Sequence, residues 1–238
     1  MNLSSSYISI IIPVFNEAEG IHEFLIELKK RIGNDLFVEI IPVDGGSTDS
    51  TLEKIQALGI SPLRSLKKGR ASQMNAGATY AKGDILYFLH ADTVPPKHFL
   101  SLIRKEIQNG ADSGCFRLSF DEDNVLMRGY AWFTRFDLLP FRFGDQSLFI
   151  NKNVFEDSGG FLEDHIVMED NEFIKRLRKQ HTFKVLEPCV ITSARKYREN
   201  GFIRLQCIFT LIFVFYYLGA NQETLVELYQ EFINNSKI

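Results

Sequence analysis

A short apolar run that ends in polar side chains, FLHADT from Phe88 to Thr93, combines residue types that suit chemistry. A strand that stops on a carboxylate is well placed to bind a hard divalent cation, because Mg²⁺ and Mn²⁺ prefer oxygen ligands. Aspartate and threonine are also common caps of a following helix, and Thr93 is expected to cap the helix that starts near Pro95. From this stretch alone, Asp92 is either a metal ligand or a helix cap. His90 either makes a polar contact or packs at the strand end.

Two further polar clusters follow apolar runs nearer the N-terminus. IPVFNE places Asn16 and Glu17 after the first run, and VDGGSTD places Asp44 before two glycines. Glycine lets a backbone approach a ligand closely, so Asp44 is a candidate acceptor of a hydrogen bond from a base or a ribose. Ser47 and Thr48 are expected to cap the next helix. The alternative for both clusters is a turn with an acid that suits the helix dipole.

The stretch LKKGRASQMNAGA brings Lys67, Lys68 and Arg70 to the start of a predicted helix. Basic side chains and free backbone N–H groups at a helix N-terminus together favour an anion such as a diphosphate. A solvated basic turn is the alternative. The sequence has neither a Walker pattern nor a GxGxxG fingerprint, which argues against an NTPase and a dehydrogenase.

Carboxylates recur in the second half of the chain. FGDQSLFI offers Asp145 and Gln146, which are expected to line a pocket before a strand. MEDNEFIKRL places Glu169 and Asp170 at the start of an amphipathic helix. The helix dipole keeps a carboxylate ionised there, which suits a base that takes a proton from a hydroxyl group. A helix N-cap is the alternative role of Asp170.

Near the C-terminus, SARKYREN places Arg195, Lys196 and Arg198 just before a long apolar stretch. These cations are suited either to neutralise a leaving phosphate or to contact an anionic lipid surface. As a helix, the apolar stretch from Cys207 to Ala220 would be roughly 21 Å long, short of the ~30 Å hydrocarbon core of a bilayer. We expect a buried or interfacial helix rather than a membrane span.

Regular alternation of strand and helix patterns is expected to position these side chains. A β-branched run predicts a strand at 8–14, and further strands are expected at 37–43, near 63 and at 85–89. Helical spacing and cap residues predict helices at 21–32, from the GGSTDST stretch, at 70–81 and from Pro95. This order favours an α/β fold with a mostly parallel central sheet and helices on both faces. In such sheets ligands bind beyond the carboxyl ends of the strands, where these polar clusters fall.

The regular alternation of strand and helix patterns ends after Ser113. The patterns predict a strand at 113–120, a helix or long aromatic loop at 125–136, a strand followed by a helix start at 146–155, a helix at 169–179, two short strands at 183–186 and 189–192, and a last helix from about Gln222. No linker-like segment interrupts the chain. One domain over 1–238 is therefore predicted.

Composition narrows the class of protein. The 238 residues carry a net charge of −3, so no overall basicity points to nucleic acid. Cys115, Cys189 and Cys207 are scattered singly, which suggests neither a disulfide framework nor a zinc site and favours a reducing cytosol. The N-terminal stretch lacks a basic region before its apolar run, so a signal peptide is not expected.

The motifs IPVFNE, VDGGSTD, GRASQMNAG, FLHADT and MED occur together in the order, and at about the spacing, found in family 2 glycosyltransferases. From Ile8 to about Tyr229 the chain resembles this family. In the forms FLHADT, GDQ, MED and TSARKY it is most similar to bacterial transferases associated with radical-SAM and selenodomain genes. The resemblance implies a GT-A type, Rossmann-like fold with a C-terminal helical segment. It divides the chain into a nucleotide-sugar-binding half (1–112), an acceptor and catalytic half (113–200) and C-terminal helices (201–238).

The resemblance also implies roles for individual residues. Asp44 matches the contact to the nucleotide base, and Asp92 matches the last aspartate of the DxD motif, which binds Mn²⁺ or Mg²⁺. Asp170 matches the base of an inverting transfer. The other candidates implied are Pro13, Phe15, Glu17, Lys67, Arg70 and His90 around the donor, Asp145, Gln146 and Glu169 in the acceptor pocket, and Arg195 and Tyr197 at the diphosphate.

Two departures from the family pattern stand out. His90 occupies the position where the motif usually has an acid. Near Arg195 the Gln and Trp of the processive Gln-x-x-Arg-Trp motif are absent, so processive polymer synthesis is not expected. The implied reaction is a metal-dependent, inverting transfer from a UDP- or GDP-linked sugar to an unidentified acceptor hydroxyl, with a lipid-linked acceptor as one option.

Other interpretations stay open at this point. A nucleotidyltransferase on a related fold would need a glycine-rich loop with Arg and Lys near the first strand, and PVFNEAEG lacks both cations. A membrane-surface module without catalysis would use RKYREN and the aromatic stretch 209–217. We expect a cytoplasmic protein with an option of peripheral contact at the inner face of the membrane. The aromatic second half also offers a homodimer surface.

Overall fold

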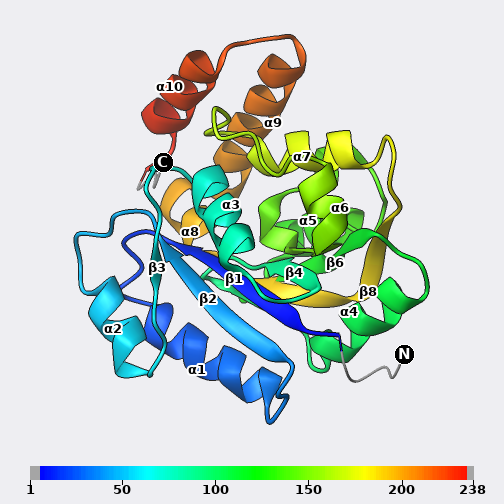
Figure 1. The fold of residues 1–238 in the computed structure, drawn as a ribbon. Coiled ribbons are helices and arrows are strands. Elements are labelled where there is room, and N and C mark those ends of the chain that lie inside the picture. Colours follow the sequence, from blue (N-terminus) through cyan, green and yellow to red (C-terminus); the bar gives the residue numbers. More distant parts are fainter. Residues whose placement is uncertain (1–5, 235–238) are drawn as a thin grey trace.

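The computed structural model describes residues 6–234, which form an α/β layered body with a helical extension (Figure 1). The strands are β1 (Ile8–Val14), β2 (Val38–Asp44), β3 (Leu63–Arg64), β4 (Ile85–Phe88), β5 (Thr93–Val94), β6 (Ser113–Phe120), β7 (Leu148–Asn151) and β8 (Phe183–Thr192). The helices are α1 (Ile21–Ile32), α2 (Thr51–Ala57), α3 (Arg70–Tyr80), α4 (Phe99–Gln108), α5 (Val125–Phe133), α6 (Lys152–Asp157), α7 (Glu169–Leu177), α8 (Arg195–Asn200), α9 (Phe202–Tyr217) and α10 (Gln222–Phe232), with short 3-10 helices η1 (Leu139–Phe141) and η2 (Gly144–Gln146). Residues 1–5, on which the signal-peptide expectation partly rests, lie outside the described range.

The eight strands form one sheet in the order β3-β2-β1-β4-β7-β6-β8-β5. Strands β3, β2, β1 and β4 are parallel neighbours, and β6 runs parallel to β8. Only β7, between β4 and β6, and the edge strand β5 pair antiparallel with their neighbours. The predicted mostly parallel sheet is therefore confirmed, and β1, β2 and β4 all end at the same edge.

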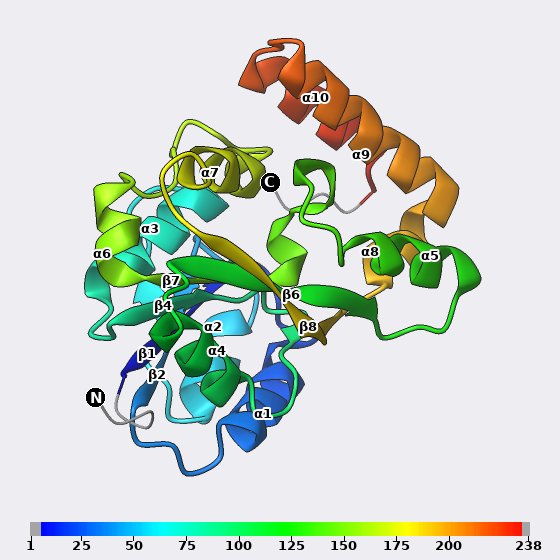
Figure 2. The same ribbon diagram turned by 90° about the vertical axis from the view of Figure 1, so that its right-hand side faces the viewer.

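Helices cover both faces of this sheet, as Figure 2 shows. Alternate residues of β1 point to opposite faces, so Ile10 belongs to the apolar cluster under α1, α2 and α4, while Ile11 belongs to the cluster under α3, α6 and α7. Burial on both faces explains why the parallel strands read as unbroken apolar runs rather than as alternating ones.

Three local predictions were wrong. Thr93 does not cap a helix: it lies in β5, where its Oγ1 is 3.0 Å from Thr192 Oγ1, and the N-cap of α4 is His98. Ser47 and Thr48 do not cap α2, which begins at Thr51, because both bond to Asn16 instead. The two short strands at 183–186 and 189–192 are one strand, β8, with an irregular register in between.

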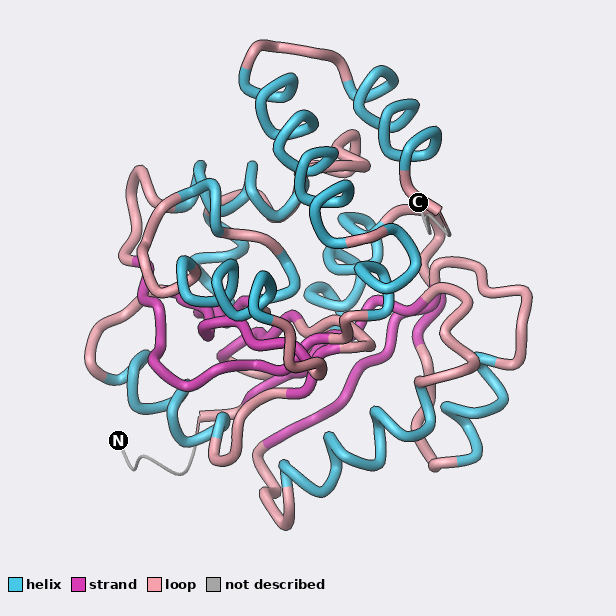
Figure 3. Tube along the Cα trace, turned by 180° about the vertical axis from the view of Figure 1, so that it is seen from behind, coloured by secondary structure: helices cyan, strands magenta, loops and turns pink. Residues whose placement is uncertain are grey.

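The C-terminal helices form a third apolar cluster. Leu205, Ile208 and Ile212 on one side of α9 pack with Leu225 and Tyr229 of α10. Seen from behind in Figure 3, this helical pair stands above the layered body. Within residues 6–234, no helix combines the length and the apolar character that crossing a membrane requires. The stretch predicted as a buried or interfacial helix is buried on one side only.

Candidate functional site

The loops that follow β1 and β2 are joined by hydrogen bonds. The backbone N–H of Asn16 donates to Ser47 Oγ at 3.0 Å, and its side-chain Oδ1 accepts from the Thr48 N–H at 2.9 Å. The N–H of Glu17 donates to Thr51 Oγ1 at 2.8 Å. Two polar clusters that are about 30 residues apart in sequence thus form one surface at the sheet edge.

Asp44 is fully buried at the end of β2. Its carboxylate accepts from the backbone N–H groups of Gly46 at 3.1 Å and Ser47 at 2.9 Å, so it orders the glycine-containing loop after the strand. Pro13 and Phe15 lie half-buried at the neighbouring end of β1. The three side chains therefore occupy one part of the sheet edge, as a common pocket requires.

Asp92 lies exposed at the turn after β4. Its backbone oxygen accepts from the Ser193 N–H at 3.1 Å, which ties this turn to the end of β8. Although the residue is accessible to solvent, partial desolvation of its carboxyl group by the surrounding protein and the charges of Asp145 and Glu17 raise the pKa of Asp92. Arg195 Nη2 lies 3.5 Å from Glu17 Oε2, so the cation predicted at the diphosphate stands at the same edge.

The concentration of negative charge around Asp92 fits a divalent cation. The negative charges of Asp145 and Glu17 repel the Asp92 carboxylate, and a bound Mg²⁺ or Mn²⁺ would relieve that repulsion. No group of three or more His, Cys, Asp or Glu side chains in residues 6–234 is arranged to hold a metal ion. Mg²⁺ commonly binds proteins through one or two carboxylates together with substrate phosphates.

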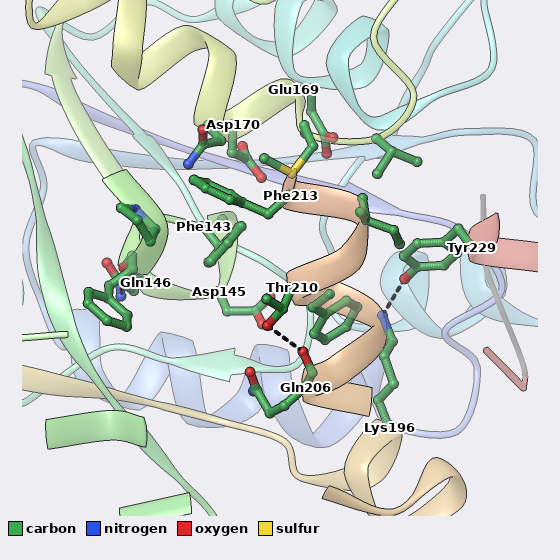
Figure 4. Close-up of a pocket in the computed structure, with 18 of the residues that line it drawn as sticks. Phe143, Asp145, Gln146, Glu169, Asp170, Lys196, Gln206, Thr210, Phe213 and Tyr229 are labelled. Atoms are coloured by element: carbon green, nitrogen blue, oxygen red, sulfur yellow. Dashed lines mark hydrogen bonds between the residues drawn. The ribbon is translucent and has the colours of Figure 1, made fainter. Parts of the chain in front are cut away.

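Beside this edge lies a cavity of about 300 Å³ between η2, α7, α9 and α10 (Figure 4). Its lining combines charged and apolar side chains, a combination common in ligand sites. The charged side chains act on one another electrostatically and are together called the charged end of the cavity: Arg70, His90, Asp145, Glu169, Asp170 and Lys196. Apolar side chains share the lining, among them Phe141, Phe143, Met168, Phe209, Ile212 and Phe213.

His90 makes a polar contact rather than packing in the core. Its Nδ1 is 3.2 Å from Asp145 Oδ1, and the ring lines the cavity. Burial opposes a charge on each partner. Nevertheless, the hydrogen bond and charge of Asp145 raise the pKa of His90, and those of His90 lower the pKa of Asp145 to about 2. The pair therefore favours an imidazolium beside a carboxylate.

Gly144 fills the space between His90 and Asp170. A Cβ atom at this position would lie 2.2 Å from Asp170 Oδ2 and 2.6 Å from His90 Nε2. The Gly144 backbone N–H also bonds the Asp170 carboxylate and lowers its pKa, although burial raises it more. Any larger residue here would push apart the two polar side chains at the charged end of the cavity.

Glu169 and Asp170 begin α7 and share one cation. Arg70 Nη1 lies 3.0 Å from Glu169 Oε1, and the Glu169 side chain is 4% exposed. Burial and the charge of Asp170 raise the pKa of Glu169 to about 7, and burial raises the pKa of Asp170. Raised carboxyl pKa values bring proton transfer closer to neutral pH, where a general base works best.

Lys196 is a largely buried cation without a carboxylate within 4.0 Å among residues 6–234. Its Nζ donates to Tyr229 Oη at 2.8 Å (Figure 4). Burial opposes its charge, but Tyr229 and Asp145 raise its pKa, so the ammonium form persists. Buried charges are normally paired, and an anionic ligand would supply the missing partner. From sequence, Lys196 was one of three cations suited to a leaving phosphate or a lipid surface, and Tyr229 carried no local signal.

A buried arginine orders the loop that carries Asp145. Arg142 is fully buried and donates to Gln146 Oε1 at 2.6 Å and to the Thr134 backbone oxygen at 2.9 Å. Gln146 Nε2 donates in turn to the Phe141 oxygen at 2.6 Å. Gln146 lines the cavity, but both ends of its side-chain amide are bonded within the loop and stabilise it. Arg142 was not a candidate from sequence, because three of its partners are backbone oxygens, which no motif marks.

The structure brings about half of the predicted site residues into this cavity. They are Arg70, His90, Asp145, Gln146, Glu169, Asp170 and Tyr197. The others lie outside its lining, namely Pro13, Phe15, Glu17, Asp44, Asp92 and Arg195 along the sheet edge, and Lys67, which is exposed and pairs with Glu163 at 2.7 Å. The functional roles of all these residues remain predictions.

Comparison with known proteins gives one family match. Residues 9–169 match the sequence model described as Glycosyl transferase family 2. Over 110 residues, 44% of this chain, the chain is 33% identical to a dolichol-phosphate mannosyltransferase of Pyrococcus furiosus. Over 213 residues, 85% of this chain, it is 26% identical to an undecaprenyl-phosphate 4-deoxy-4-formamido-L-arabinose transferase of Shewanella sediminis. The matches cover 31% and 57% of the lengths of these two curated relatives.

Solved structures share the fold at low sequence identity. A mannosyltransferase of Pyrobaculum calidifontis in complex with GDP-Man and Mn²⁺ superposes with a TM-score of 0.71 and 16% identity, covering 94% of this chain and 70% of that one. Residues 1–349 of S. aureus TarS in complex with UDP-GlcNAc give a TM-score of 0.68 and 16% identity, over 95% and 71% of the two chains. The predicted GT-A type fold is confirmed by these likenesses.

Proposed function

The chain belongs to glycosyltransferase family 2, and from this premise we propose that it moves a sugar from a nucleotide-sugar donor to an acceptor hydroxyl with inversion. One observation carries the proposal: Asp170, a carboxylate with a raised pKa, lines a cavity next to the sheet edge that carries Asp92. A base and a charged edge for a diphosphate are the two parts that such a transfer needs.

In this reaction the acceptor oxygen attacks the anomeric carbon while the bond from that carbon to the diphosphate oxygen breaks on the opposite side. Asp170 accepts the proton of the acceptor hydroxyl, which increases the nucleophilicity of the oxygen as the new bond forms. Gly144 and the start of α7 hold the carboxylate in place. Attack from the side opposite the leaving group inverts the anomeric centre.

Charges on both sides of the cavity support departure of the diphosphate. Asp92 would hold a Mg²⁺ or Mn²⁺ ion, whose chemistry is to stabilise the negative charge on the leaving group. Arg70, His90 and Lys196 add positive charge at the charged end of the cavity. Arg195 and Tyr197 complete the proposed diphosphate contacts, and Asp44, with Pro13, Phe15 and Glu17, is proposed to hold the base. We assign Lys67 to the outer rim of the donor site.

Substrates are proposed from the relatives. Complexes with UDP-GlcNAc and with GDP-Man and Mn²⁺ exist for proteins of the same fold, which supports a UDP- or GDP-linked donor and a divalent cation. The names of two relatives contain dolichol-phosphate and undecaprenyl-phosphate, which supports a lipid-linked acceptor. We further propose a cytoplasmic location with peripheral contact at the inner face of the membrane, and membership of the radical-SAM-associated subgroup.

A screen of nucleotide-sugar hydrolysis with Mn²⁺ tests the proposal, because glycosyltransferases commonly release sugar slowly to water. We expect one UDP- or GDP-sugar to be hydrolysed, and Asp170→Asn to lower the rate about 10²–10⁴-fold, the range typical of a general base. Asp164→Asn, a change at an 81% exposed aspartate, is the control and should keep the full rate. No hydrolysis of any donor, or equal rates in both variants, would refute the assignment.

A further inference from the structure

An exposed aromatic cluster lies on the outer side of the segment 125–138, which contains α5. Trp132, Phe133 and Phe136 are 47%, 45% and 41% exposed, although their rings pack together at centroid distances of 5.1 Å (Trp132–Phe133) and 5.0 Å (Trp132–Phe136). Val125, Leu126 and Leu138 of the same segment are also exposed. Large apolar side chains that gather on a surface normally mark a contact site.

A second apolar surface runs along α9. Ile203, Leu211, Val214 and Leu218 are 68%, 42%, 44% and 77% exposed, and their spacing of three, four or eight residues places them on one side of the helix. Arg204 is the only charged residue of α9. The opposite side packs on α10, so this helix has a buried face and an unpartnered apolar face.

These two surfaces belong to connected elements on one side of the molecule. Met127 of α5 lies in the same apolar cluster as Leu205 and Ile208 of α9, and Figure 2 shows α5 and α9 on the same side of the sheet. Both elements also line the cavity from within, through Tyr130 of α5 and Phe213 of α9. The exposed surfaces are therefore the outer sides of the walls that enclose Asp170.

A second copy of the chain is a poor match for these surfaces. The stripe on α9 is roughly 24 Å long and about one helix diameter, roughly 10 Å, wide. Together with α5, which is roughly 14 Å long, it would bury on the order of 400 Å² per partner, whereas a stable interface buries about 800 Å². A fluid bilayer accommodates two separate apolar strips without matching their shapes.

The residue types of the exposed surface also favour a lipid bilayer as the binding partner. Tryptophan, phenylalanine and arginine are favoured where protein meets the lipid headgroups, because an apolar body can enter the acyl region while the polar end stays hydrated. The guanidinium carbon of Arg135 lies 4.6 Å from the centroid of the Trp132 ring, and Arg128 is 63% exposed beside it. Arg128 pairs with Asp123 at 2.9 Å, so the surface carries little net charge and its affinity must come from apolar insertion.

We propose that the segment 125–138 and the outer face of α9 form a docking surface that lies in the interface of a lipid bilayer. Docking brings the cavity of Asp170 to the membrane without crossing it, as in monotopic proteins. Contact with the bilayer follows from these surfaces alone. Its purpose, access of a lipid-anchored acceptor to the cavity, rests on the proposed glycosyl transfer.

Tryptophan fluorescence can be used to follow docking, because Trp132 is the only tryptophan of the chain. On addition of phosphatidylcholine vesicles, we expect the fluorescence of Trp132 to shift to shorter wavelength and to be quenched by lipids brominated on the acyl chains. Co-sedimentation with vesicles should survive about 0.5 M NaCl, where interactions between exposed charges are screened. Binding lost in salt, or no quenching, would overturn the proposal.

Variants locate the surface. Trp132→Ala, and separately Leu211→Glu with Val214→Glu, should each lower the vesicle partition coefficient about tenfold or more, because each removes apolar area from the contact. Leu36→Glu, a change at an 86% exposed leucine outside both segments, is the matched control and should bind like the parent chain. Equal loss in all variants, or a concentration-dependent dimer that only Leu211→Glu with Val214→Glu dissolves, would contradict docking.

Donor hydrolysis without vesicles separates this proposal from the preceding one. Neither Trp132 nor Leu211 lines the cavity, so all of these variants should hydrolyse the donor at the parent rate. Vesicle binding without any donor hydrolysis would leave the docking surface standing and refute the enzyme. Donor hydrolysis without vesicle binding would do the reverse.

Discussion

At the scale of single residues, Glu169 and Asp170 compete for one guanidinium. Arg70 bonds Glu169 directly, at 3.0 Å, while Asp170 is oriented by the N–H of Gly144. Burial and mutual repulsion make it costly to ionise both carboxylates. One group therefore keeps its proton longer as the pH rises, and the pair titrates as a unit.

This coupling predicts a pH profile. Asp170 acts only as the ionised base, and its pKa is raised by burial, so kcat/KM for donor hydrolysis should increase with pH across a limb above the ordinary carboxyl range. Glu169→Gln weakens the hold of residue 169 on Arg70, whose charge lowers the pKa of Asp170, and should therefore move that limb to lower pH. A profile that is the same in both proteins would show that the two carboxylates do not interact.

Lys196 offers a second test at this scale. Burial of an ammonium group without a counter-ion costs stability, so Lys196→Met should leave the melting temperature unchanged or raise it. The same change should weaken binding of UDP or GDP about tenfold or more, as judged by calorimetry, because it removes a cation from the charged end of the cavity. Lys105→Met, at an exposed lysine of α4, is the control and should keep the parent affinity. Nucleotide affinity that is unchanged in Lys196→Met would exclude Lys196 from the donor site.

At the scale of elements, α3 sits unusually close to the sheet. Gln73 Nε2 donates to the backbone oxygens of Val14 at 2.8 Å and Val43 at 2.7 Å, which ties the helix to the ends of β1 and β2. One turn on, a Cβ atom at Gly77 would lie 2.4 Å from Ile11 Cγ2. The motif GRASQMNAG thus positions the basic turn by close helix–strand packing.

This packing predicts opposite effects at two helical glycines. Gly77→Ala should lower the free energy of unfolding by about 1–3 kcal/mol, since overpacking outweighs the better helix propensity of alanine. A Cβ atom at Gly129 of α5 would meet no other atom within 4 Å, so Gly129→Ala should raise it by about 0.5–1 kcal/mol. Urea unfolding measures both. Destabilisation of similar size in the two variants would contradict the packing argument.

Among the elements, the main strands could be predicted from the sequence, whereas some helix caps could not. The strands β1 and β4 were predicted because burial on both faces leaves largely apolar runs. The caps at Ser47 and Thr93 were wrong because these side chains bond to neighbouring loops and strands, which local patterns do not encode. Charged side chains of the site were predicted from their positions at the ends of strands. The contact of Lys196 with Tyr229 joins α8 to α10, and no sequence motif indicated it.

At the scale of the whole molecule, the sheet edge and the C-terminal helices complement each other. The edge carries the charged groups, and α9 and α10 close the cavity with aromatic side chains. Glycosyl transfer needs both, because the leaving diphosphate is charged and the reacting hydroxyl must be desolvated. The family motifs identified the edge, while the helical wall depends on packing across the chain.

The most direct test of the account is the melting temperature with UDP or GDP, with and without Mn²⁺. We predict a rise when nucleotide and metal are present together, equivalent to about 2.7 kcal/mol at a hundredfold excess over Kd. Asp92→Ala should abolish the metal-dependent part, while Asp164→Asn keeps it. No metal-dependent shift with either nucleotide, or a full shift in Asp92→Ala, would contradict the proposed donor site.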